Sequence, residues 1–107
     1  MLTIDEDYKL TLTQHDNAVL DFSLSNGTLK TGDIVYFVVK KDLSQEYYDI
    51  EVIVDTFTDG VAKIFIPETQ TNIDAGYYRY AICVHTSEGK ISTVISNKLK
   101  IIGSVHK

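Results

Sequence analysis

The stretch IDAGYYRYAICV, residues 73–84, is the most informative about the fold and contains three of the chain's seven tyrosines. Apolar or aromatic side chains recur at every second position from Tyr78 onward, which is the period of a β-strand with one buried face. We therefore expect Tyr78 and Tyr80 to belong to the core, whereas Tyr77 points the other way. The full inward set is Tyr78, Tyr80, Ile82 and Val84.

The same alternation recurs along the whole chain, with turn-forming residues between the runs and almost no helical periodicity. This pattern predicts an all-β, antiparallel sandwich of about seven strands in one domain, residues 1–107, with its core in about 8–102. We expect one helical turn within 67–76 and a bulge near 96–98. The expected strands are Tyr8–Thr13, Asn17–Ser23, Asp33–Lys40, Tyr47–Thr56, Val61–Pro67, Gly76–Thr86 and Lys90–Ile102.

Asp74, Gly76 and Tyr78 fit the pattern D-x-G-x-Y-x-C, and this part of the chain resembles the sixth strand of immunoglobulin-like domains. The resemblance implies a tyrosine corner, in which the Tyr78 hydroxyl bonds a backbone group a few residues upstream. Asp74 would cap the turn, and Gly76 would allow tight packing or an unusual φ. Tyr80 stands where such domains carry a disulfide cysteine, and Phe37 substitutes for their core tryptophan.

Three longer segments resemble small structural proteins of tailed phages and prophages of low-GC Gram-positive bacteria, in particular the immunoglobulin-like N-terminal domain of the baseplate upper protein. They are TGDIVYFVVKKD (31–42), IEVIVD (50–55) and DGVAKIFIPETQTNIDAGYYRYAICVHTSEGKISTVISNKLKIIG (59–103). The resemblance implies a virion structural protein whose partners are other virion proteins or further copies of itself. The shared positions are core or turn residues, namely Gly32, Val35, Phe37, Val39, Asp59, Gly60, Ile64, Ile66, Pro67, Thr69, Gly76, Tyr78, Tyr80, Ile82, Gly89, Thr93 and Val94.

Charge and composition narrow the classes of partner. The formal net charge of −5 argues against binding to a nucleic acid backbone, which needs clustered Lys and Arg. No apolar run approaches the roughly 20 residues of a membrane helix, and MLTIDEDYKL has no signal-peptide pattern. We expect synthesis in the cytoplasm, with a virion as the possible destination. The single cysteine, Cys83, excludes an intrachain disulfide and a multi-cysteine zinc site.

The predicted third strand, IVYFVV at residues 34–39, is apolar on both faces. In an immunoglobulin-like arrangement it lies beside the sixth strand, so its second face would form an apolar and aromatic patch typical of an interface. The alternative is that the loop 41–46 or the N-terminal segment folds over this face. The candidate interface residues are Ile34, Tyr36, Val38, Tyr77, Arg79, Ala81, Cys83 and His85.

Other candidate sites have a plainer interpretation. Tyr36, Tyr47, Tyr48 and Tyr77 are candidates for a carbohydrate platform, although tyrosine is also a common strand residue. The carboxylates could hold calcium only on a shaped loop, which the sequence lacks, so they are expected on solvated strand faces. These carboxylates are Asp5, Glu6, Asp7, Asp49, Glu51 and Asp55. The three histidines, His15, His85 and His106, are too far apart in the sequence to match the spacing of a metal-binding motif.

No nucleophile, acid/base pair or phosphate-binding loop is apparent, and no cofactor or metal is expected. The sequence therefore favours a non-enzymatic assembly module acting through protein–protein contacts. A carbohydrate- or host-surface-binding sandwich is the alternative.

Overall fold

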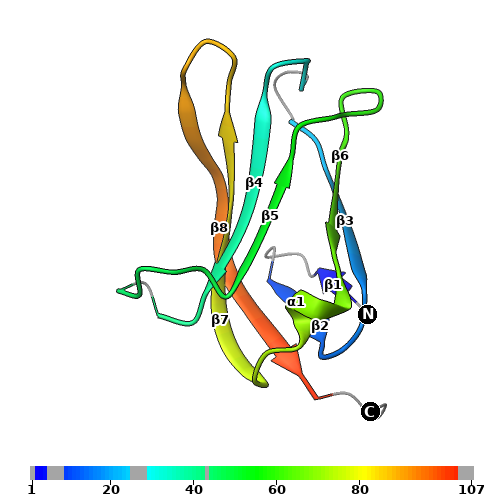
Figure 1. Cartoon of the computed structure of the whole chain (residues 1–107), viewed down its shortest axis with the longest axis vertical. Coiled ribbons are helices and arrows are strands. Elements are labelled where there is room, and N and C mark those ends of the chain that lie inside the picture. The colour runs from blue at the N-terminus through cyan, green and yellow to red at the C-terminus, as the bar shows by residue number, and fades with distance from the viewer. Residues whose placement is uncertain (1, 5–8, 25–28, 43, 104–107) are drawn as a thin grey trace.

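The computed structural model describes residues 2–4, 9–24, 29–42 and 44–103. Its strands form two facing layers (Figure 1). One layer is a six-stranded sheet with the order β1-β2-β8-β7-β4-β5, and the other is the pair β3-β6. The elements are β1 (Leu2–Ile4), β2 (Leu10–Thr13), β3 (Ala18–Phe22), β4 (Ile34–Lys40), β5 (Ile50–Val54), β6 (Ala62–Ile66), α1 (Glu68–Thr71), β7 (Gly76–His85) and β8 (Ile91–Ile102).

The core lies between the two layers and follows the alternation of the sequence. On β4, Val35, Phe37 and Val39 are fully buried, whereas the residues between them are only partly covered. The aromatic ring of Phe37 lies 5.8 Å from that of Tyr80 between ring centroids. This contact confirms that two aromatic side chains fill the core where a disulfide and a tryptophan would otherwise pack.

The topology is that of an immunoglobulin-like all-β sandwich, as predicted. β4, β7 and β8 are neighbours in one sheet, and β3 pairs with β6 in the other. One pairing corrects the prediction of a purely antiparallel fold, because β2 runs parallel to β8, with Leu10 opposite Leu99. β1 and β2 belong to the six-stranded sheet. The turn at residues 14–17 then leads to β3 in the second sheet, so β2 and β3 lie in different layers.

The tyrosine corner is present at the start of β7. The Tyr78 hydroxyl donates a hydrogen bond of 2.7 Å to the backbone carbonyl of Asp74. Gly76 has a φ of +150°, and a Cβ built there would meet no atom within 4 Å. The glycine is therefore needed for its backbone conformation, and of the two predicted reasons tight packing does not apply. Asp74 contributes to the corner through its backbone carbonyl oxygen, which accepts this bond.

Several strand limits differ from the prediction. β1, which pairs antiparallel with β2, was not expected, and Tyr8, the predicted start of the first strand, lies outside the described residues. β5 begins at Ile50 rather than at Tyr47, and just before it the Asp49 carboxylate accepts a 2.8 Å hydrogen bond from the Lys41 N–H. The predicted helical turn is α1.

The bulge in β8 also lies elsewhere than predicted. Ile82 pairs with Ile95, but the next residue, Cys83, pairs with Thr93. Val94 is therefore the extra residue, and the strand passes residues 96–98 in regular register. A bulge shifts the alternation of a strand by one residue. In β8, even-numbered side chains therefore face the other sheet before Val94 in the sequence, and odd-numbered ones do so after it.

Candidate protein-interaction face

The six-stranded sheet has one face toward β3 and β6 and a second face turned away from them, which we call the outer face. All eight predicted interface residues lie on it. Tyr36 stands opposite Cys83, and Val38 stands opposite Ala81, so the residues of β4 and β7 form cross-strand pairs. The eight are Ile34, Tyr36, Val38, Tyr77, Arg79, Ala81, Cys83 and His85.

The middle of the outer face is aromatic and apolar. The rings of Tyr36 and His85 are stacked at a tilt, with 4.3 Å between their centroids. The Cys83 Sγ lies 3.6 Å from the Thr93 Oγ1, so the single thiol of the chain sits at the centre of this surface. Tyr36, Cys83 and His85 are each half-buried by their neighbours on the sheet. The central side chains therefore hold one another in place and still present their upper surfaces to solvent.

Two isoleucines extend this surface beyond the predicted set. Ile53 on β5 stands opposite Tyr36 and is 56% exposed. Ile91 on β8 stands opposite His85 and is 69% exposed. The alternation of β5 could have indicated Ile53. The position of Ile91 could not be read from the sequence, because the bulge at Val94 reverses which side chains of β8 point outward.

The alternative was that the loop 41–46 or the N-terminal segment folds over the outer face, and the described residues of these two segments leave most of it uncovered. The loop after β4 is bonded mainly to itself, as in the 3.1 Å bond from the Gln45 N–H to the Asp42 carbonyl. Two of its described residues approach the face: Tyr48 borders a hollow of about 130 Å³ together with Val38 and Ala81, and Lys41 lines another hollow with Tyr77 and Arg79. The described N-terminal strand, β1, lies at the edge of the sheet beyond β2.

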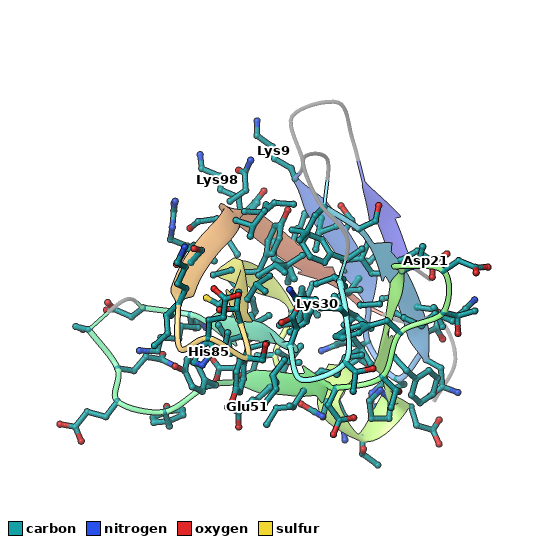
Figure 2. The ribbon with its side chains drawn as sticks, turned by 90° about the horizontal axis from the view of Figure 1, so that it is seen from above. Lys9, Asp21, Lys30, Glu51, His85 and Lys98 are labelled. Carbon is teal, nitrogen blue, oxygen red and sulfur yellow. The ribbon has the colours of Figure 1, made fainter. Side chains whose placement is uncertain are left out.

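The lower end of the outer face, where β7 begins, is basic. Arg79 stands between Lys40 on β4 and Lys98 on β8 in one cross-strand row. Tyr77 is 70% exposed, and the Lys100 ammonium lies 5.5 Å from its ring centroid. Figure 2 shows Lys98 and His85 on the side of the molecule away from Asp21, which projects from β3.

The remaining sequence candidates do not assemble into a site. Asp49, Glu51 and Asp55 are spread along β5 and its two ends, and His15 occupies the turn after β2. Among the residues that the structure describes, no three His, Cys, Asp or Glu side chains are grouped to hold a metal ion. The run at residues 5–7 and His106 lie outside those residues. In the described part of the chain, no helix is long and apolar enough to cross a membrane.

A hollow of about 550 Å³ lies between β3 and β8. Its walls include Leu20, Phe22, Ile82 and Ile95, and its lining holds one carboxylate, that of Asp21, without a histidine, cysteine or lysine. Among the described residues, β2 pairs with β8 only at residues 99–102, so it does not extend along the part of β8 that lines the hollow. Such a lining suits apolar contact and offers no acid/base pair.

Comparisons with known proteins identify solved structures with a similar fold but do not assign the chain to a family. No protein-family model matches the chain, and a search of curated proteins gives no significant match. Eighteen chains of solved structures are similar. One is a "putative glycoside hydrolase" from Bacteroides vulgatus ATCC 8482, with a TM-score of 0.52 and 13% identity over 90% of this chain. This chain spans only 17% of that protein's length. Another is murine CRIg, with a TM-score of 0.43 and 12% identity over 97% of both chains.

Proposed function

We propose that this domain is a non-enzymatic assembly module that contacts other protein surfaces through its outer face. The observation that supports the proposal is the continuous row formed by Ile53, Tyr36 and Cys83 across three neighbouring strands. Single exposed apolar side chains are common on soluble proteins, whereas a contiguous apolar patch is typical of a contact surface.

The arrangement of charge around the patch has the anatomy of a protein interface. Charged side chains such as Glu51 and Arg79 stand at the margin, and no charged side chain separates Tyr36 from Cys83. Protein interfaces are depleted of charge at the centre and polar at the rim, and they often use aromatic residues and arginine as anchors. Tyr36 is the proposed central contact and Arg79 the proposed anchor at the margin.

The sequence resemblance to phage and prophage structural proteins supports the context of this assembly role. We infer from it a tail- or baseplate-type protein whose partners are other virion proteins or further copies of itself, located in the virion. The alternative is a carbohydrate-binding module that uses the exposed Tyr47, Tyr48 and Tyr77. Lysine ammonium groups lie over the rings of Tyr48 and Tyr77 and take up surface on which a sugar would stack.

The area of the outer face indicates how tightly two copies of the domain could associate through it. Four strands about 4.8 Å apart, which contribute on average about eight residues of about 3.3 Å, give roughly 500 Å² of flat sheet per copy. Stable interfaces bury about 800 Å² per partner, so self-association through this face is expected to be weak, with a Kd in the range of tens to hundreds of micromolar.

The test compares solution mass by sedimentation at about 10 to 500 µM for the wild type, Tyr36→Lys and Phe65→Lys. Phe65 is the matched control, because it is an exposed aromatic residue on β6, in the other sheet. We expect concentration-dependent association of the wild type and of Phe65→Lys and a monomeric Tyr36→Lys. The Cys83 thiol should become slower to alkylate as association proceeds. If the wild type and Tyr36→Lys are both monomers and equally stable, the proposal fails, and binding to a glycan array that Tyr77→Ala abolishes would favour the alternative.

A further inference from the structure

The hollow between β3 and β8 is bordered by two strands that each have a partner on one side only. In the described part of the chain, β3 pairs only with β6, and β2 pairs with β8 only at residues 99–102. Residues 91–97 of β8 are paired with β7 alone, and we call their other side the open edge. A strand edge without a partner presents backbone N–H and C=O groups to which a further strand can bond.

The hollow lies along these strand edges and not only over one face of each strand. Its lining includes four consecutive residues from each side, 20–23 and 94–97. Successive side chains of a strand point to opposite faces, so a consecutive run lines one hollow only where the hollow reaches the edge. The backbone edge and the apolar side chains are therefore accessible from the same space.

The backbone of Ser96 points to the open edge. The Ile102 carbonyl accepts the Gln14 N–H at 2.9 Å, on the side of β2. The direction of backbone groups alternates along a strand, and the register with β7 is regular from residue 95 to 101, so Lys98 and Ser96 turn to the same side. The Lys98 N–H is satisfied locally by the side-chain carbonyl of Asn97 at 2.8 Å. Among the described residues, no strand pairs with Ser96 on this side.

The core is less well covered along the hollow than on either side of it. On β3, Leu20 is only partly buried, although Ala18 and Phe22, which face the same way, are each 5% exposed. On β8, Ile95 is partly buried, whereas Leu99, which stands beside β2, is fully buried. Apolar side chains added at the open edge would complete this layer and leave water.

We propose that the open edge binds an extended segment of a partner protein, which joins β8 as a further strand in line with β2 and places alternate apolar side chains in the hollow. The free edge of residues 91–97 is about 23 Å long, so such a segment directs three or four side chains inward. Main-chain bonds to β8 hold the segment, and the apolar walls select its side chains. The site is separate from the outer face, so the inference does not depend on the proposed function.

The chain's own N-terminal residues do not match this occupant. The described strand before β2 is β1, which pairs with the edge of β2 that faces away from β8. The residues that directly precede β2 in the sequence include Asp5, Glu6 and Asp7. A carboxylate set against apolar walls loses hydration without gaining a partner. A segment from another protein, with apolar residues at every second position, has the chemistry that the open edge requires.

The probe is a synthetic peptide of about nine residues in which valine and threonine alternate between terminal lysines. The control peptide has the same composition with its valines in one block. Binding is followed by amide NMR shifts of the protein. We expect the alternating peptide to shift the amides of residues 94–97 and to slow hydrogen exchange of the Ser96 amide by about 10-fold, since that group gains a partner. The block peptide should bind about 10-fold more weakly.

The protein variants separate main-chain bonding from apolar contact. Ser96→Pro removes the N–H at the open edge, where proline is tolerated because the group is not needed by β7, and should weaken binding by about 10-fold. Ser96→Ala keeps the N–H and should bind like the wild type. Val94→Lys changes a hollow-lining residue that is 43% exposed, so folding should persist while binding falls by about 10-fold. Tyr36→Lys, on the outer face, should bind normally.

Each other outcome overturns the inference. Equal binding of both peptides, or full binding by a folded Ser96→Pro, would show an apolar hollow that does not add a strand. Shifts confined to Val19 and Asp21 would place the strand on β3. A Ser96 amide already protected in the concentrated protein alone would identify a second copy as the occupant. No shift at about 2 mM peptide would reject the site. Because Tyr36→Lys tests the outer face and Ser96→Pro tests the open edge, either idea can fail without the other.

Discussion

Replacing Tyr78 by phenylalanine removes one hydroxyl group from the tyrosine corner and leaves the ring in place. That hydroxyl donates to the Asp74 carbonyl at 2.7 Å, and the side chain is only 4% exposed. A typical hydrogen bond contributes about 1 kcal/mol net, and an acceptor left dry costs more. Because Asp74 lies on an exposed turn, water can reach its carbonyl. We therefore expect Tyr78→Phe to lower the free energy of unfolding by about 1 kcal/mol and Tm by about 4 °C.

The same substitution has an effect that depends on pH. Burial raises the pKa of the Tyr78 phenol above its usual 10.0, and the negative charges of Asp49 and Asp74 add to this shift. The folded protein therefore keeps this proton at pH values where the unfolded chain loses it. The resulting stability is complete below pH 10 and is lost as pH rises through the folded pKa. The advantage of the wild type over Tyr78→Phe should be constant from about pH 6 to 9 and shrink above pH 10.

The assay is urea unfolding followed by far-ultraviolet circular dichroism at pH 7 and at a series of alkaline pH values. Tyr77→Phe is the control, because its hydroxyl is on a side chain that is 70% exposed, and it should match the wild type. If Tyr78→Phe is as stable as Tyr77→Phe at pH 7, the corner bond does not stabilise the fold. A difference that grows above pH 10 would show that the sign of the linkage is wrong.

Two further predictions concern the turns that hold the sheet. The buried Asp33 carboxylate accepts the Lys30 and Ser87 N–H groups, both at 3.2 Å, so Asp33→Ala should cost about 2 to 3 kcal/mol in urea unfolding. Asp33→Asn should lose less, and a loss equal to that of the exposed control Asp55→Ala would contradict this role. Gly76→Ala should cost about 1 to 3 kcal/mol through backbone strain alone, since a Cβ there has open space around it. Gly103→Ala, where a Cβ meets only an ordinary 3.8 Å contact, should melt like the wild type, and equal melting of both variants would show that φ at Gly76 is unstrained.

The inward and outward faces of most strands could be predicted from the sequence, because the alternation of β4 and β7 is local and uninterrupted. It placed Phe37 and Tyr80 in the core and Tyr36 and Cys83 on the outer face, and the structure confirms these positions. The prediction was incomplete for β8. A bulge at Val94 changes the phase of alternation there, and nothing in the local residues marks that position as the extra one.

The partners of a strand are not encoded in its own alternation, since any strand with one apolar face satisfies the same local rule. Local patterns in the sequence were enough to predict the sandwich, the tyrosine corner and the side chains available on each strand. Only the tertiary structure paired β2 parallel to β8 and set Lys40, Arg79 and Lys98 in one row, although they are far apart along the chain. Register and strand order depend on how all the buried faces fit together, so the charge pattern of the outer face emerges only when the whole sheet is assembled.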